Sequence, residues 1–192
     1  MTIRGFGAPE KQMFCGNLLL IACCAFYLAW WLLAFRPERP VRGMRSGWLL
    51  LPATAAGLGA VVLIVRGVFA APAGVSPFPA GSLLWGGAAA YFALLALTRL
   101  AFRRPVTTEL FLIVGWAVLV LAETGALRGL GRLSRGTAAA FSAAAGLVAA
   151  ADLVCYTLYY RLDARAGYFD GMVPLASAIP FMAALCAAMA AG

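Results

Sequence analysis

Six long apolar stretches, separated by short segments that hold most of the charged residues, run along the chain. Each stretch has about 20 residues, which is the length of a helix that crosses a hydrocarbon core of about 30 Å. The apolar runs are continuous and do not alternate with period two, so they predict helices and not barrel strands. The expected helices cover about residues 14–35, 46–65, 82–102, 107–127, 137–160 and 171–190.

This pattern predicts an all-α, polytopic membrane protein, a bundle of six transmembrane helices. The connecting segments are too short to hold a second domain, so we expect one transmembrane domain over residues 1–192. Pro174 suits the first turn of the last helix. Pro180 lies well inside the same helix and predicts a kink there.

The composition agrees with a membrane environment and removes several kinds of site. The chain is 64% hydrophobic and 11% charged, whereas about a quarter of the residues of a soluble domain are charged. There is no histidine, which excludes haem ligation through histidine, His-based zinc sites and Ser–His or Cys–His catalysis. We expect no cofactor and no metal site. The five cysteines form no C-x-x-C motif and are interpreted as small buried hydrophobes.

The net charge of +8 comes from basic residues near the helix ends and in short loops, where they anchor to lipid headgroups, so no nucleic acid is expected as a partner. If the N-terminus is outside, the inner side holds nine basic residues and the outer side six. The inner set is Arg36, Arg39, Arg42, Arg45, Arg99, Arg103, Arg104, Arg161 and Arg165; the outer set is Arg4, Lys11, Arg66, Arg128, Arg132 and Arg135. This bias predicts both termini outside a cell membrane, of the bacterial inner or plasma membrane kind.

The expected helix 137–160 is rich in alanine. Ala138, Ser142, Gly146 and Ala150 recur every four residues and share one helix face. Small residues at this spacing let neighbouring backbones approach closely. We therefore expect this helix inside the bundle, wrapped by the first, third and fourth helices.

Asp152 is the acid that most needs an explanation. Nine residues separate it from Arg161, which marks the interface, so it lies roughly 13 Å deeper, near the bilayer midplane. A carboxylate there costs about 2.5–3.5 kcal/mol, so we expect it to face the bundle interior. The alternative is a structural hydrogen bond to a neighbouring helix. Cys155, Tyr156, Tyr159 and Asp163 fall on the same side as Asp152 and extend a polar stripe towards the surface.

Two further polar residues lie in apolar segments. Glu123 comes about one turn before the end of the fourth helix, where it would either pair with Arg128 or line an outward-facing cavity. Asn17, near the start of the first helix, is a candidate for a hydrogen bond between helices.

Other polar and aromatic residues have structural explanations. Glu109 suits the first turn of a helix, and Asp170 is expected to be the N-cap of the last helix. Asp163 is expected in a solvated turn. Tyr159 has the alternative of an interfacial aromatic belt, the role expected of Trp30 and Trp31.

The leading functional hypothesis is a transporter, or a solute-capturing membrane subunit, with a polar site around Asp152. The proposed substrate-binding residues are Asp152, Tyr156, Glu123, Tyr159 and Asn17, the partners are membrane lipids and a small-molecule or ion substrate, and no catalytic residue is assigned. The alternative is an accessory or assembly subunit that packs on a second copy or another membrane subunit through small-residue faces. A lipid-acting enzyme ranks third, because no G-x-S-x-G or H-E-x-x-H motif is present and only Asp152 and Glu123 could supply acid–base chemistry.

Overall fold

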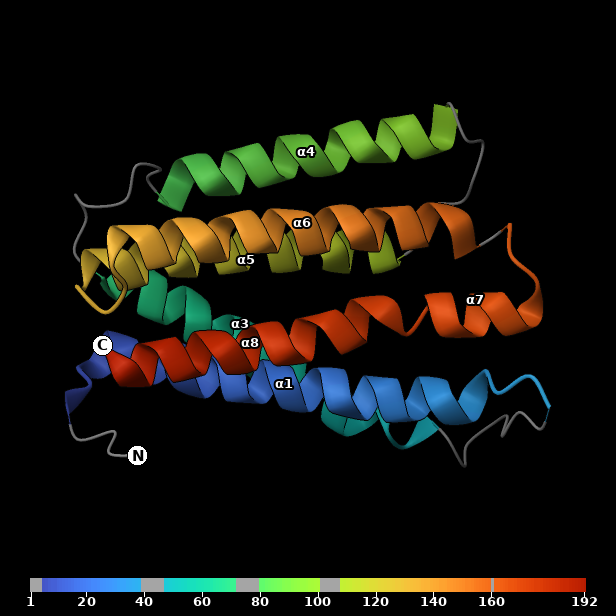
Figure 1. The fold of residues 1–192 in the computed structure, drawn as a ribbon, viewed down its shortest axis with the longest axis horizontal. Helices are drawn as coiled ribbons and strands as arrows, with labels where there is room; N and C mark the ends of the chain where they lie inside the picture. The colour runs from blue at the N-terminus through green and yellow to red at the C-terminus, as the bar shows by residue number, and fades with distance from the viewer. Residues whose placement is uncertain (1–4, 39–46, 72–79, 101–107, 160) are drawn as a thin grey trace.

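The structure is a computed structural model that describes residues 5–38, 47–71, 80–100, 108–159 and 161–192. The described chain is helical and contains no strand, as the apolar pattern predicted. Its helices are α1 (Ala8–Ala34), α3 (Leu50–Ala70), α4 (Ala80–Leu100), α5 (Thr108–Gly129), α6 (Arg135–Tyr159), α7 (Ala164–Asp170) and α8 (Val173–Ala191). The long helices run alternately in opposite directions, and the start of α1 and the end of α8 lie at the same end of the group (Figure 1).

Five helical segments of the described chain are long and apolar enough to cross a membrane. They are Ala8–Ala34, Leu50–Ala70, Leu110–Gly129, Arg135–Tyr159 and Ala164–Ala191. The described apolar part of α4, Trp85–Leu97, is shorter. By helix length and composition the chain is a multi-pass membrane protein.

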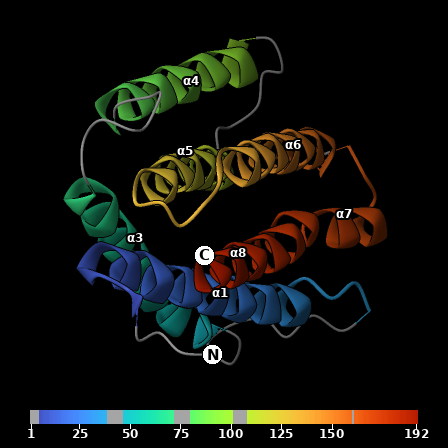
Figure 2. The ribbon, with the colours of Figure 1, turned by 60° about the vertical axis from the view of Figure 1, so that its left-hand side comes forward.

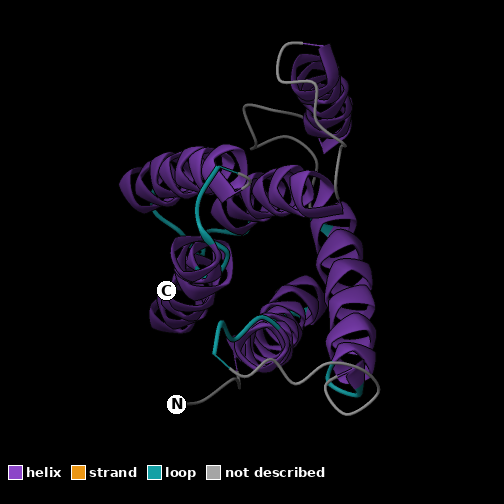
Figure 3. Ribbon diagram, turned by 90° about the vertical axis from the view of Figure 1, so that its right-hand side faces the viewer, coloured by secondary structure: helices purple, strands orange, loops and turns teal. Residues whose placement is uncertain are grey.

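The helices form two groups, which are joined by α8 and by a contact between α3 and α5. α1 packs on α3 and α8, while α5 packs on α6 and α4. α8 also contacts α6 and so lies between α1 and α6 (Figure 2). Seen end on, α4 lies at one edge of the assembly (Figure 3), and its main contact is with α5.

Glycines permit the close contact between α1 and α3. A Cβ atom at Gly67 would lie 2.6 Å from Cγ of Met13 and 2.8 Å from the carbonyl oxygen of Pro9. A Cβ atom at Gly16 would lie 2.5 Å from Cγ1 of Ile64. Backbones approach this closely only where side chains are absent, which is how small residues join membrane helices.

Gly67→Ala is therefore expected to lower the free energy of unfolding by about 1–3 kcal/mol, because the added methyl group meets a backbone oxygen that cannot move aside. Gly146→Ala on α6 is the matched control, because no atom lies within 4 Å of its Cβ position. That change should be neutral or stabilise by up to about 1 kcal/mol. Denaturant unfolding of both variants in detergent measures the difference, and equal stabilities would contradict a tight α1–α3 contact.

The first helix begins at Ala8, six residues before its expected start at residue 14, and includes polar residues that precede the apolar stretch. Pro9 stands in the first turn, and Glu10 accepts a hydrogen bond from the backbone N–H of Gly7. Glu10 also forms an ion pair with Arg132, at 2.6 Å between Oε1 and Nε. Arg132 lies in the α5–α6 turn, so this pair fixes the start of α1 to that turn. The ends of the other long helices lie within five residues of the expected positions.

The segment before the last helix differs from expectation. Asp170 is not the N-cap of that helix, because it ends the short helix α7, and Met172 is the N-cap of α8. Asp163 is exposed, as expected of a turn residue, and it is the N-cap of α7, with Oδ1 accepting a hydrogen bond from the backbone N–H of Ala166 at 2.7 Å.

α6 does not lie inside the bundle in the way that its small residues predicted. It packs mainly on α5 and α8, not within α1, α4 and α5, the helices that cover the expected first, third and fourth segments. Ala138 is buried, but Gly146 and Ala150 are exposed. The buried residues of α6 are Ala138, Ala145, Asp152 and Tyr156. The contacts of α6 therefore follow a different face, and the Gly146–Ala150 side is left uncovered.

Candidate functional site

Asn17 and Glu123 form a hydrogen-bonded pair inside the bundle. Asn17 comes from α1 and Glu123 from α5, and both side chains are 0% exposed. Nδ2 of Asn17 donates to Oε1 of Glu123 at 2.6 Å and lies 4.0 Å from the sulfur of Met189 on α8. Three helices distant in sequence thus converge on one polar contact, and the expected interhelical role of Asn17 is present.

Glu123 does not pair with Arg128, as one of its two sequence interpretations proposed. No lysine or arginine of the described chain lies within 4.0 Å of its carboxylate. The remaining oxygens of the pair, Oε2 of Glu123 and Oδ1 of Asn17, are buried and accept no hydrogen bond from the described residues. Buried polar atoms without a partner are rare and need a physical explanation.

Asp152 lies in the interior, as its cost in a bilayer predicted, and is 3% exposed. Its described contact is the hydroxyl of Ser177 on α8, 3.4 Å from Oδ1. The same hydroxyl lies 3.0 Å from the carbonyl oxygen of Pro174 and has one proton to donate. The longer contact to Asp152 is therefore the weaker one.

The neighbours of Asp152 on α6 have different roles. Tyr156 is buried and belongs to an apolar cluster with Leu110 and Ile113 of α5. Tyr159 is half-buried, and its ring centroid lies 5.8 Å from that of Trp31. The expected stripe therefore divides: Asp152 faces α8, Tyr156 faces α5, and Tyr159 contacts the aromatic residues at the end of α1.

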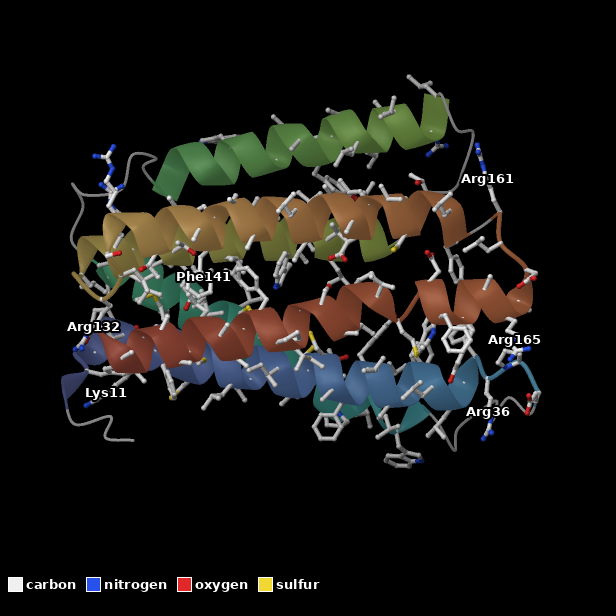
Figure 4. The ribbon with its side chains drawn as sticks, viewed as in Figure 1. Lys11, Arg36, Arg132, Phe141, Arg161 and Arg165 are labelled. Carbon is white, nitrogen blue, oxygen red and sulfur yellow. The ribbon has the colours of Figure 1, made fainter. Side chains whose placement is uncertain are left out.

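An apolar layer separates the two buried acids. Val120 of α5, Ala145 of α6, and Phe181 and Met182 of α8 form its buried core. Trp116 and Phe141 pack their rings on Phe181 at centroid distances of 5.3 and 5.7 Å. Phe141 lies between α6 and α8 (Figure 4).

The position of this layer follows from the helix register. Phe181 lies one turn after Ser177, and Val120 one turn before Glu123, so the layer lies between the levels of the two acids. Trp116, at this level, has a buried indole N–H with no acceptor among the described residues.

The two acids lie at different depths. Glu123 precedes the end of α5 by six residues, roughly 9 Å, whereas Asp152 follows the start of α6 by 17 residues, roughly 26 Å. Because these two helix ends are joined by a short turn, the acids are separated by roughly 17 Å along the bundle. At this separation the two carboxyl groups do not lie side by side, as joint acid–base action on one bond, the enzymatic chemistry that the sequence suggested, would require.

Ser177, Met189 and Trp116 were not among the residues predicted for the site. Ser177 had a usable signal, since it is a polar residue three positions before Pro180 in an apolar helix. Met189 and Trp116 had none, because neither residue is unusual in an apolar run. Within the described chain, no group of three or more potential metal ligands comes together.

No family model, no curated protein and no solved structure matches this chain. The functional proposal therefore depends on the arrangement of its own residues.

Proposed function

We propose that the protein is a membrane transporter for a small cationic solute, with Asp152 as its recognition group. The observation that carries the proposal is the pair of buried carboxyl groups, Asp152 and Glu123, at different depths of a chain with five membrane-length helices. Intramembrane acids are costly and mark ion or solute pathways when they face the bundle interior.

The chemistry of the interior supports the sign of the solute. Asp152 and Glu123 have no described arginine or lysine within 4.0 Å, and Asn17 offers a further unpaired oxygen. These groups lack donors and positive charge, which a protonated amine or another small cation supplies. An anion would meet like charge at both acids, which opposes its transfer from water.

The apolar layer supports transport over permanent capture. A solute bound at Asp152 must pass Phe181 and its aromatic neighbours to reach the level of Glu123. Pro180 adjoins Phe181 and cannot donate a hydrogen bond to the carbonyl of Ala176, so α8 lacks one helical hydrogen bond at this level. Interrupted helices at the depth of a binding site are characteristic of transporters. We expect the helix to bend at this point when the layer opens.

Asp152→Asn is expected to abolish uptake into proteoliposomes and ligand-induced thermal stabilisation, because the amide keeps the shape but removes the negative charge. The probes are small primary amines, quaternary ammonium compounds and alkali cations. Asp163→Asn is the matched control, since this exposed residue caps α7 and asparagine caps equally well. Stabilisation of wild type and Asp152→Asn alike by the same probe would contradict the assignment of Asp152.

We further propose that α4 is a sixth membrane span, which completes the six-helix bundle, and that both termini are outside a bacterial-type inner or plasma membrane. α4 has 21 residues and runs opposite to α5. Lys11 and Arg132 lie at one end of the group, and Arg36, Arg161 and Arg165 at the other (Figure 4). Five of the nine basic residues assigned to the inner side, Arg39, Arg42, Arg45, Arg103 and Arg104, lie outside the described residues.

A second candidate function is that of an accessory subunit, and the uncovered side of α6 favours it. Gly146 and Ala150 are exposed, and a Cβ atom at Gly146 would meet nothing within 4 Å. Under this proposal another membrane subunit or a second copy packs there. Gly146→Leu should then remove a co-purifying subunit or the dimer, whereas a transporter that works alone should tolerate the change.

A further inference from the structure

We propose that Asn17 and Glu123 form a proton-binding site, in which one proton is held between Oε2 of Glu123 and Oδ1 of Asn17. Both oxygens are buried acceptors without a donor, on side chains already joined through Nδ2 and Oε1 at 2.6 Å. One hydrogen atom on Oε2 supplies the donor that the pair lacks. The proton comes from the aqueous phase, forms an O–H bond at Glu123, and returns to water when that bond breaks.

The surroundings favour a proton over a metal cation. Calcium takes six to eight oxygen ligands and magnesium six. Near Glu123 the described chain offers two unpaired oxygens and the thioether of Met189. The hydroxyl of Thr124, the next residue, donates its one proton to the carbonyl oxygen of Val120 at 2.7 Å, so it supplies no donor to the two unpaired oxygens. A single proton satisfies this set, while a metal ion would keep an incomplete shell.

Few other titratable groups compete for this proton. On the helices around the pair, the titratable residues nearest in level are Cys186 of α8, Cys15 of α1 and Arg66 of α3, and of these Cys15 and Arg66 are exposed. Cys186 is buried. On α1, Glu10 is already paired with Arg132. On α6, Asp152 lies beyond the apolar layer.

Only the role of the proton site in transport rests on the proposed function. If transport is correct, binding and release of this proton on one side of the apolar layer would drive movement of a cation bound at Asp152 on the other. Proton binding itself needs no solute and is tested on the purified full chain in lipid.

The test follows the infrared carbonyl band of protonated carboxylic acids while the pH of the buffer is stepped from acid to alkaline. As the pH rises, wild type is expected to lose one component of this band, the one that belongs to Glu123. Glu123→Gln is expected to lack this component already at acid pH, whereas Asp152→Asn is expected to show it at acid pH and to lose it as wild type does. Equal spectra for wild type and Glu123→Gln over the whole pH range would overturn the proposal.

Asn17→Ala keeps the carboxyl group and removes its partner, so it remains informative if Glu123→Gln does not fold. Loss of the hydrogen bonds should change the proton affinity of Glu123 by about tenfold, the size expected for one such bond. If the pH at which half of the Glu123 band is lost is the same in Asn17→Ala as in wild type, the proton is not shared between the two side chains. The infrared titration does not depend on transport, so the proton site can be correct when the Asp152→Asn transport test fails, and the reverse also holds.

Discussion

Replacing Trp31 with alanine is expected to lower the free energy of unfolding by about 3 kcal/mol, from lost packing and one lost hydrogen bond. The sequence suggested an interfacial belt residue, but Trp31 is buried, at 8% exposure. Its indole N–H donates to the carbonyl oxygen of Tyr168 in α7 at 3.1 Å. Gly171, between α7 and α8, lies directly against the ring. Trp31 therefore fixes the end of α1 to the α7–α8 turn.

Trp30→Ala is the matched control for this prediction. Trp30 precedes Trp31 on the same helix and is half-buried, and the ring contacts recorded for it, with Tyr27 and Phe35, are close in sequence. Its loss should cost about 1 kcal/mol or less, because its ring contacts are with residues of the same segment and its side chain is less buried than that of Trp31. Thermal or denaturant unfolding in detergent compares the two variants. Equal losses would restore the belt interpretation for both residues.

The helices were predictable because continuous apolar runs of membrane length leave the backbone no other way to satisfy its hydrogen bonds. Where a helix began was less predictable. Glu10 and Lys11 lie in the first turn of α1, although they lower its mean hydropathy. Glu10 is accommodated because Arg132, 122 residues later, pairs with it. A hydropathy pattern contains no information about such a distant partner.

Helix packing was predicted less well, and α6 shows the reason. The spacing of Ala138, Ser142, Gly146 and Ala150 permits a close neighbour but does not specify one. In a bilayer an exposed alanine or glycine has little cost, since lipid is as apolar as a protein core. The close contact instead lies at Gly16 and Gly67 of α1 and α3, where backbone and side-chain atoms fill the available space.

For the candidate site, the burial of Asp152 was predictable and the partners of the two acids were not. The cost of a carboxyl group near the midplane places Asp152 inside the protein whatever the packing. Glu123 lies nearer a helix end, where pairing with Arg128 and an outward-facing cavity were both open, and it is fully buried. Which groups they meet depends on the relative rotation of α1, α5, α6 and α8. Ser177 contacts Asp152 from 25 residues away, and Asn17 contacts Glu123 from 106 residues away. Local spacing suggested neither pair.

Asn17→Leu is expected to destabilise the protein by about 2–3 kcal/mol, because Glu123 would remain buried with no hydrogen-bond partner. Leucine has the same branched shape as asparagine, so loss of the polar contact dominates over any change in volume. Glu123→Met is expected to cost a similar amount for the converse reason, since it leaves the amide of Asn17 unpaired. Denaturant unfolding of each variant in detergent measures these losses.

The double variant Asn17→Leu/Glu123→Met decides whether the pair stabilises the fold or serves another purpose. Removing both polar groups leaves neither a donor nor an acceptor unpaired at this contact, so the stability of the double variant should return to within about 1 kcal/mol of wild type. The double-mutant cycle would then give a coupling of about 3 kcal/mol or more. Strictly additive losses would mean that the contact at 2.6 Å carries no coupling. A recovered stability together with lost proton binding would separate function from folding at this site, since an apolar pair could then hold α1 and α5 together as well as the polar one does.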